Sequence, residues 1–123
     1  MSNKIDVWQK AKIKNIEIKN RIVRSATNEH LGTLDGCITD DYITVYNNLA
    51  KNGVGLIITS HMAIDRNQRA DVTQICVNDI RNEEKLKLLT SIVHRLWFKN
   101  NRSNFLLRSF WSQSERTNSK NSK

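Results

Sequence analysis

Residues 20–29 read NRIVRSATNE, an apolar pair between two arginines followed by small polar side chains. Ile22 and Val23 are β-branched and favour a short, buried strand, predicted over residues 22–26. The small residues that follow leave room for a flat ligand to approach the backbone where the strand ends. Residues 53–61, GVGLIITSH, repeat this pattern further along the chain. Two strands that end in polar residues and are joined by a helix form a parallel βαβ unit.

The segment between the two strands carries the signals of a helix. Thr39 or Asp40 can cap its start, and Asn52-Gly53 can end it, because glycine adopts the left-handed cap conformation without strain. Apolar residues recur between them at helical spacing: Tyr42, Ile43, Tyr46, Leu49 and Ala50. Leu56–Ile58 then form a second strand without alternation, as expected when both faces are covered.

Further elements are predicted on either side of this unit. Residues 11–18 alternate weakly around Lys14-Asn15, which predicts a β-hairpin, with a polar arm as the alternative. Residues 31–38 contain turn signals and are predicted to form a loop. Asn82 is predicted to cap a second helix with one apolar face: Leu86, Leu89, Val93 and Leu96. No third strand is predicted after it, and residues 96–123 are expected to form an irregular, disordered tail.

The overall composition is that of one globular domain, with 123 residues of which 38% are hydrophobic and 26% charged. No apolar run approaches the roughly 20 residues of a membrane helix, and the N-terminus lacks the apolar core of a signal peptide. Cys37 and Cys76 form no CxxC motif. We therefore expect a reduced, cytoplasmic protein without a membrane partner.

The formal net charge of +8 is concentrated at the C-terminus, since basic residues outnumber acidic ones six to one over residues 97–123. A basic segment with aromatic side chains can bind nucleic acid through phosphate contacts and base stacking. This segment matches no nucleic-acid-binding motif. A non-catalytic basic interaction module with a nucleic-acid-binding tail is therefore the alternative interpretation of the chain.

The remaining motifs indicate no second chemistry. His30, His61 and His94 combine with no carboxylates at a metal-ligand spacing, so no metal site is predicted. Gly53-Val54-Gly55 lacks the third glycine of a dinucleotide fingerprint and leads into a strand instead of a helix. A helix cap followed by a tight strand entry explains these two glycines.

The patterns above resemble the beginning of the NADH:flavin oxidoreductases of the Old Yellow Enzyme family. NRIVRSAT at residues 20–27 and LAKNGVGLIIT at residues 49–59 carry the resemblance, which extends over residues 12–95. It implies a TIM barrel that holds FMN and uses NAD(P)H to reduce activated alkenes or related small molecules. The predicted fold class is therefore α/β: about two βα units of a TIM (β/α)8 barrel within residues 1–95, preceded by the hairpin.

The resemblance also implies a cofactor site. Ser25, Ala26, Thr27 and Asn28 fall at the end of the first barrel strand, against the flavin ring. Asn28 stands where other members have a Thr or Cys near the reactive edge of the flavin. His61 ends the second strand, where members often have a small residue whose backbone approaches the flavin. The family's substrate-anchoring His/Asn or His/His pair, its proton-donating Tyr and its phosphate site have no counterpart here, so no catalytic residue is assigned.

Residues 96–104, LWFKNNRSN, offer a reason why the resemblance stops. With A/T-rich codons, reading one nucleotide later gives YGSKIIAQI, which is similar to the turn, third strand and flavin-contacting glutamine of the family. We hypothesise that the residues beyond Arg95 are translated out of frame. The chain would then be a truncated barrel that does not catalyse the family's reaction.

Overall fold

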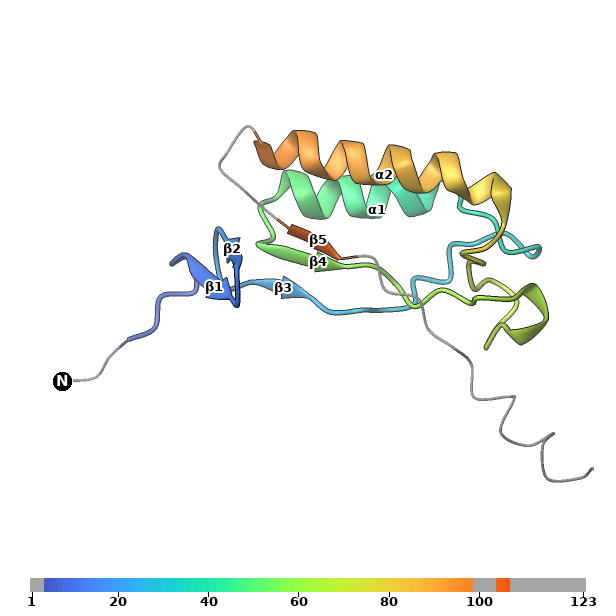
Figure 1. The fold of residues 1–123 in the computed structure, drawn as a ribbon, viewed down its shortest axis with the longest axis horizontal. Coiled ribbons are helices and arrows are strands. Elements are labelled where there is room, and N and C mark those ends of the chain that lie inside the picture. The colour runs from blue at the N-terminus through green and yellow to red at the C-terminus, as the bar shows by residue number, and fades with distance from the viewer. Residues whose placement is uncertain (1–3, 99–103, 107–123) are drawn as a thin grey trace, which may run out of the picture.

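The computed structural model describes residues 4–98 and 104–106 (Figure 1). An N-terminal two-stranded antiparallel sheet precedes a three-stranded parallel sheet in the order β3-β4-β5. Two helices lie side by side over one face of the parallel sheet (Figure 1). In chain order the elements are β1 (Ala11–Ile13), β2 (Ile16–Ile18), β3 (Val23–Arg24), α1 (Asp40–Lys51), β4 (Leu56–Ile58), the 3₁₀ turn η1 (Arg66–Gln68), α2 (Ile80–Phe98) and β5 (Asn104–Leu106).

Helix α1 begins and ends where the sequence predicts. The hydroxyl oxygen of Thr39 accepts a hydrogen bond from the Tyr42 backbone N–H at 3.2 Å, which satisfies one of the unpaired donors of the first turn. Asn52 is the C-cap residue, and Gly53 follows with a φ of +89°. Only glycine takes this left-handed conformation readily, so the chain can turn sharply from α1 into β4.

Asn20 and Gly55 hold the start of β3 against the start of β4. The Asn20 amide donates to the Gly53 carbonyl at 2.7 Å, and its oxygen accepts from the Ile22 N–H at 3.1 Å. A side chain at Gly55 would bring its Cβ to 2.5 Å from the Asn20 carbonyl oxygen. The predicted tight strand entry is therefore confirmed, because the two backbones approach too closely for any residue except glycine.

The core lies between the helices and the parallel sheet. Its central side chains are almost fully buried: Tyr42, Tyr46, Ile57, Leu89 and Val93. Four of them come from the predicted apolar faces of the two helices, and Ile57 comes from the middle of β4. The helical periodicity of both segments therefore identified the buried faces correctly.

The predicted cap of the second helix was wrong. Helix α2 begins at Ile80, so Asn82 lies within its first turn. The Asp79 side chain instead accepts the Arg81 backbone N–H at 3.0 Å. Asn82 is completely buried, and its amide bonds three backbone groups outside the helix, which explains its place inside a helical turn.

The expectation that no third strand follows α2 was also wrong. Strand β5 pairs in parallel with β4 in the register Leu56↔Asn104, Ile57↔Phe105 and Ile58↔Leu106. This pairing satisfies backbone groups along an edge of β4, which the periodicity of the sequence does not reveal. Most of the predicted irregular tail, which the alternative interpretation takes as a nucleic-acid-binding segment, lies outside the described residues.

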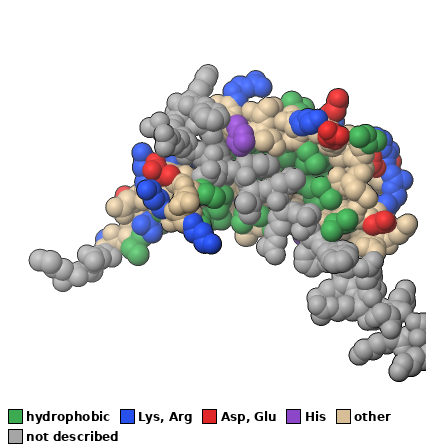
Figure 2. All heavy atoms as spheres, in the orientation of Figure 1, with side chains coloured by type: hydrophobic (Ala, Val, Ile, Leu, Met, Phe, Trp, Pro, Cys, Tyr) green, Lys and Arg blue, Asp and Glu red, His purple; other side chains and the backbone are tan. Residues whose placement is uncertain are grey.

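The surface is mixed in character. Figure 2 shows hydrophobic side chains reaching the surface between charged residues at the two ends of the face drawn. The exposed apolar residues include Trp8 and Ile13 near the N-terminus and Val23 on β3. Among the described residues, no helix is both long and apolar enough to cross a membrane.

Candidate functional site

The candidate site lies at the carboxyl ends of β3 and β4. These strands pair in parallel, with Val23 opposite Leu56 and Arg24 opposite Ile57, so the segments that follow them leave the sheet at the same end. We call residues 25–28 and 59–61 the rim. The first rim segment contains all four predicted site residues after β3, and the second contains His61.

The first rim segment carries small side chains, and two of them are exposed to solvent. Ser25 and Thr27 are exposed, whereas Ala26 and Asn28 are half-buried, an alternation that continues the extended backbone of β3. The Thr27 hydroxyl donates to the Ser25 carbonyl at 3.1 Å. The end of β3 is therefore bordered by small side chains, two of which are exposed.

Asn28 is held by its protein neighbours. Its amide nitrogen donates to Asp71 Oδ2 at 2.5 Å, and its oxygen accepts from the His30 N–H at 3.1 Å. Asp71 lies in the long connection after β4, and its other oxygen accepts from the Thr73 N–H at 2.8 Å and hydroxyl at 2.6 Å. Burial opposes ionisation of Asp71, but the hydrogen bonds from Thr73 and Asn28 outweigh it and keep its pKa below the usual range. The Asn28 amide is therefore fixed in orientation.

A buried network joins the two rim segments from behind. Glu29 Oε1 accepts hydrogen bonds from Arg24 Nη2 at 3.1 Å and from the Tyr46 hydroxyl at 2.8 Å. The Tyr46 oxygen in turn accepts the Ser60 backbone N–H at 2.8 Å, and the Tyr42 hydroxyl bonds Ser60 Oγ at 2.8 Å. Residues from β3, α1 and the segment after β4 therefore meet in one cluster.

Both tyrosines in this cluster remain protonated. Burial raises the pKa of Tyr42 to about 12 and shifts the pKa of Tyr46 further in the same direction. Their ring centroids are 4.8 Å apart, as expected for residues one helical turn apart. Their helical spacing predicts both as core residues, and no pattern in the sequence assigns a role to Glu29. The i, i+4 tyrosine pair was the only sequence signal for this network.

The second rim segment is held through its backbone. The Gln74 amide donates to the His61 carbonyl at 3.3 Å, and Gln74 Oε1 accepts from the Ala70 N–H at 2.6 Å. Gln74 is itself buried. The His61 side chain is half-buried. Within the described part of the chain, no three His, Cys, Asp or Glu side chains are grouped as metal ligands, and Cys37 and Cys76 form no disulfide.

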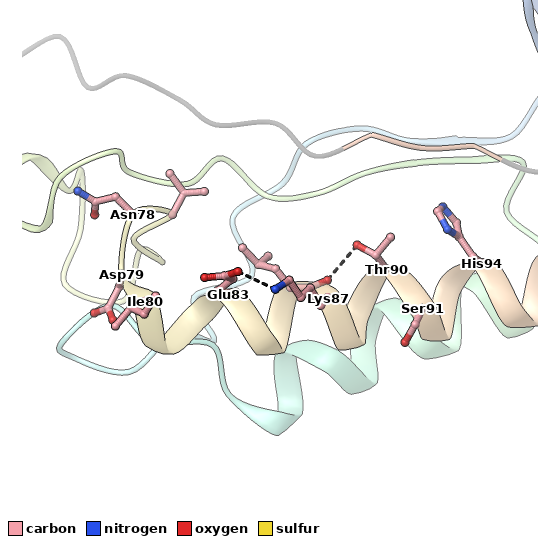
Figure 3. A pocket seen from close by; sticks show the side chains of 10 residues that line it. Asn78, Asp79, Ile80, Glu83, Lys87, Thr90, Ser91 and His94 are labelled. Carbon is pink, nitrogen blue, oxygen red and sulfur yellow. Dashed lines mark hydrogen bonds and ion pairs between the residues drawn. The ribbon is translucent and has the colours of Figure 1, made fainter.

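A separate groove of about 590 Å³ runs along α2 (Figure 3). It is lined by the connection before α2 and by one face of the helix, where Lys87 pairs with Glu83 at 2.6 Å and Thr90 and His94 follow (Figure 3). None of the predicted site residues lines it. The groove is therefore distinct from the rim.

The arrangement defines an α/β protein in which two polar segments lie together at the carboxyl edge of a parallel sheet. Residues 6–99 match the family model of the NADH:flavin oxidoreductase / NADH oxidase family. Because this match covers most of the chain, the protein belongs to that family. The resemblance seen in the sequence is thereby confirmed.

Solved structures of old yellow enzymes share the fold. The old yellow enzyme from Trypanosoma cruzi aligns with a TM-score of 0.72 at 19% identity, covering 85% of this chain and 26% of that one. The enzyme from Pichia sp. aligns with a TM-score of 0.72 at 24% identity and the same coverage. Morphinone reductase in complex with tetrahydroNAD aligns with a TM-score of 0.70 at 16% identity, covering 86% of this chain and 27% of that one.

The present chain therefore spans about a quarter of the length of these structures. A comparison with curated proteins yields no match.

Proposed function

We propose that this chain is the N-terminal part of an FMN-dependent NAD(P)H:acceptor oxidoreductase of the ene-reductase type, built as a TIM barrel. The family match over residues 6–99 carries the proposal. The rim supports it, because (β/α)8 enzymes bind their ligands at the carboxyl ends of the strands. The proposal places Ser25, Ala26, Thr27, Asn28 and His61 beside the flavin, and it places the protein in the cytoplasm.

The residues present fit a flat cofactor. Ser25 and Thr27 are exposed at the end of β3, and Ala26 between them adds no bulk. Asn28 presents an amide that Asp71 and the His30 N–H hold in one orientation. The flavin, when bound, would supply the hydride chemistry, and the chain would bind and orient it.

We further propose that the 123-residue chain does not turn over substrate by itself. Its described parallel sheet has three strands, whereas a complete barrel has eight and typically takes about 250 residues. A sheet of three strands cannot close around a substrate. Small-molecule substrates and NAD(P)H therefore belong to the complete barrel in this proposal.

Flavin binding by the purified chain tests the cofactor proposal. We expect FMN fluorescence to be quenched on titration with the chain, without NAD(P)H oxidation. Thr27→Trp fills the approach to the backbone and should weaken binding by at least about tenfold, or 1.4 kcal/mol. Thr44→Trp is the matched control, because Thr44 is an exposed threonine on α1 away from the rim. Absence of quenching, or equal weakening by both variants, would contradict the proposal.

The out-of-frame origin of the residues beyond Arg95 is a separate proposal. It is supported by the shifted peptide YGSKIIAQI, which is similar to the family's third strand. The nucleotide sequence of the gene tests it directly. A shifted frame that continues into further βα units would support the proposal, and a shifted frame that soon stops would contradict it.

A further inference from the structure

A buried carboxylate lies directly behind the first rim segment. The Glu29 side chain is only 7% exposed, and its Oε1 atom accepts from Arg24 at 3.1 Å. Arg24 immediately precedes residues 25–28 and Glu29 immediately follows them. The ion pair therefore links the two residues that flank the first rim segment.

The same carboxylate reaches the second rim segment through one tyrosine. Tyr46 has a single hydroxyl proton and donates it to Glu29 at 2.8 Å, so its oxygen is available to accept the Ser60 N–H at 2.8 Å. Tyr46 is completely buried and Ser60 nearly so. Two consecutive hydrogen bonds thus connect Glu29 to the backbone that follows β4.

The pair is poorly arranged as a purely stabilising contact. Arg24 Nε and Glu29 Oε2 are buried yet have no hydrogen-bond partner in the described structure. Burying a charged pair costs desolvation energy, and the remaining polar atoms must be bonded before the pair stabilises the fold strongly. Hydrophobic residues would fill this space at a lower cost. The geometry that the pair imposes on the rim is the better explanation for its presence.

We propose that Glu29 is a positioning residue, which fixes residues 25–28 relative to residues 59–61 through Arg24 and Tyr46. This inference rests on the proposed function, since the rim matters as a site only if it holds the flavin. Glu29 touches neither cofactor nor substrate in this role. It sets the spacing of the two backbone segments that would border them.

Backbone dynamics of the purified chain test the proposal without any ligand. Nitrogen-15 relaxation should give order parameters near 0.85 for residues 25–28, as in rigid backbone. Tyr46→Phe and Glu29→Gln should each lower them toward about 0.6, while amides in the middle of α2 stay unchanged. Glu29→Gln retains the shape and an acceptor for Tyr46 but removes the charge that pairs with Arg24, and it decides the question if Tyr46→Phe does not fold.

Tyr42→Phe is the matched comparison. Tyr42 is equally buried on the same helix, bonds Ser60 Oγ and donates to the Tyr46 hydroxyl at 3.4 Å, but it does not bond Glu29. It should lower the order parameters of residues 25–28 by less than Tyr46→Phe does. The proposal is overturned if these residues are flexible in the wild-type chain, if they stay rigid in both rim variants, or if Tyr42→Phe loosens them equally.

An FMN titration of the same variants separates this proposal from the proposed function. Loss of rim order in Tyr46→Phe together with weakened FMN binding supports both. If the wild-type chain binds no FMN, the proposed function fails, while the order parameters still decide the positioning role. Wild-type FMN binding together with a rim that stays rigid in Glu29→Gln and Tyr46→Phe would overturn the positioning role alone.

Discussion

The hairpin and the parallel sheet are built from similar residues but differ in what covers them. Ile13 and Ile16 in the hairpin are 47% and 39% exposed and only Ile18 at its end is buried, whereas Ile57 in β4 is completely buried. All four are β-branched residues in strands of three residues. Helices α1 and α2 lie over the parallel sheet, and no described helix lies over the hairpin (Figure 1). Backbone pairing is therefore sufficient to form a strand, but its side chains become a buried core only where a layer of helices packs over them.

This difference locates the stability of the chain. A hairpin by itself is at best marginally stable in water, because it buries little apolar surface. The helix–sheet layer buries large side chains such as Tyr46, Leu89 and Val93 almost fully. The free energy of unfolding should therefore respond strongly to substitutions in that layer and weakly to substitutions of the exposed hairpin residues.

The largest expected effect is a cavity in the helix–sheet layer. Leu89→Ala should lower the free energy of unfolding by about 2–5 kcal/mol, because the side chain is completely buried in α2. Ile13→Ala in the hairpin should change it by less than about 0.5 kcal/mol. Urea denaturation followed by circular dichroism measures both. Equal losses would show that the hairpin contributes as much to stability as the covered sheet.

A smaller effect is expected from the buried polar group of the same layer. Asn82 accepts the Ile38 N–H at 2.8 Å and donates to the carbonyls of Gly36 and Cys76, each at 2.8 Å. Asn82→Ala would leave these backbone groups without their partner and should lower the free energy of unfolding by about 1–3 kcal/mol.

Asn67→Ala provides the control for this experiment. Asn67 is an exposed asparagine in η1, so its substitution should change the free energy of unfolding by no more than about 0.5 kcal/mol. The same urea titration gives both values. A cost for Asn82→Ala no larger than that of Asn67→Ala would mean that the loop before α1 and the start of α2 do not depend on this amide.

Local patterns predicted the helix and second strand of the βαβ unit well, because their signals lie close together in the sequence. The first strand was predicted too long and too buried, since β3 spans only Val23–Arg24 and Val23 is 45% exposed. Thr39, Gly53 and the apolar faces of the helices each act on their own element, and the structure has them where their local patterns predict them. Asn82 was misassigned because a cap and a buried amide look alike in sequence. Strand β5 was missed because its pairing with β4 is a tertiary contact.

The candidate site was predicted only in part for the same reason. The small residues after β3 are visible in the sequence, and their positions are consistent with the expected rim. Their supports are not visible, since Asn28 bonds Asp71 and Glu29 bonds Tyr46 across long sequence separations. Nothing in the periodicity of the chain indicates which polar residues meet behind the rim.

The smallest expected effect is a loss of stability in acid where the loop before α1 meets the start of α2. A hydrogen bond from the Thr33 hydroxyl, together with the Arg81 guanidinium at 2.6 Å, lowers the pKa of Asp35 to about 2. Arg81 also lowers the pKa of Asp79, which it contacts at 2.6 Å. Because these pKa values are lower in the folded state, ionisation stabilises the fold above the ordinary carboxyl pKa of about 4.

Stability should therefore fall as the pH drops from about 4 toward 2. Arg81→Met removes the cation shared by Asp35 and Asp79 and should flatten this dependence in thermal unfolding curves recorded at each pH. Lys10→Met is the control at the hairpin. Lys10 immediately precedes β1, its Nζ atom lies 3.9 Å from Glu17 Oε1, and both side chains are accessible to water. Lys10→Met should leave the pH dependence of stability unchanged. If Lys10→Met flattens the pH dependence of stability as strongly as Arg81→Met, an ion pair of the hairpin contributes to stability as well.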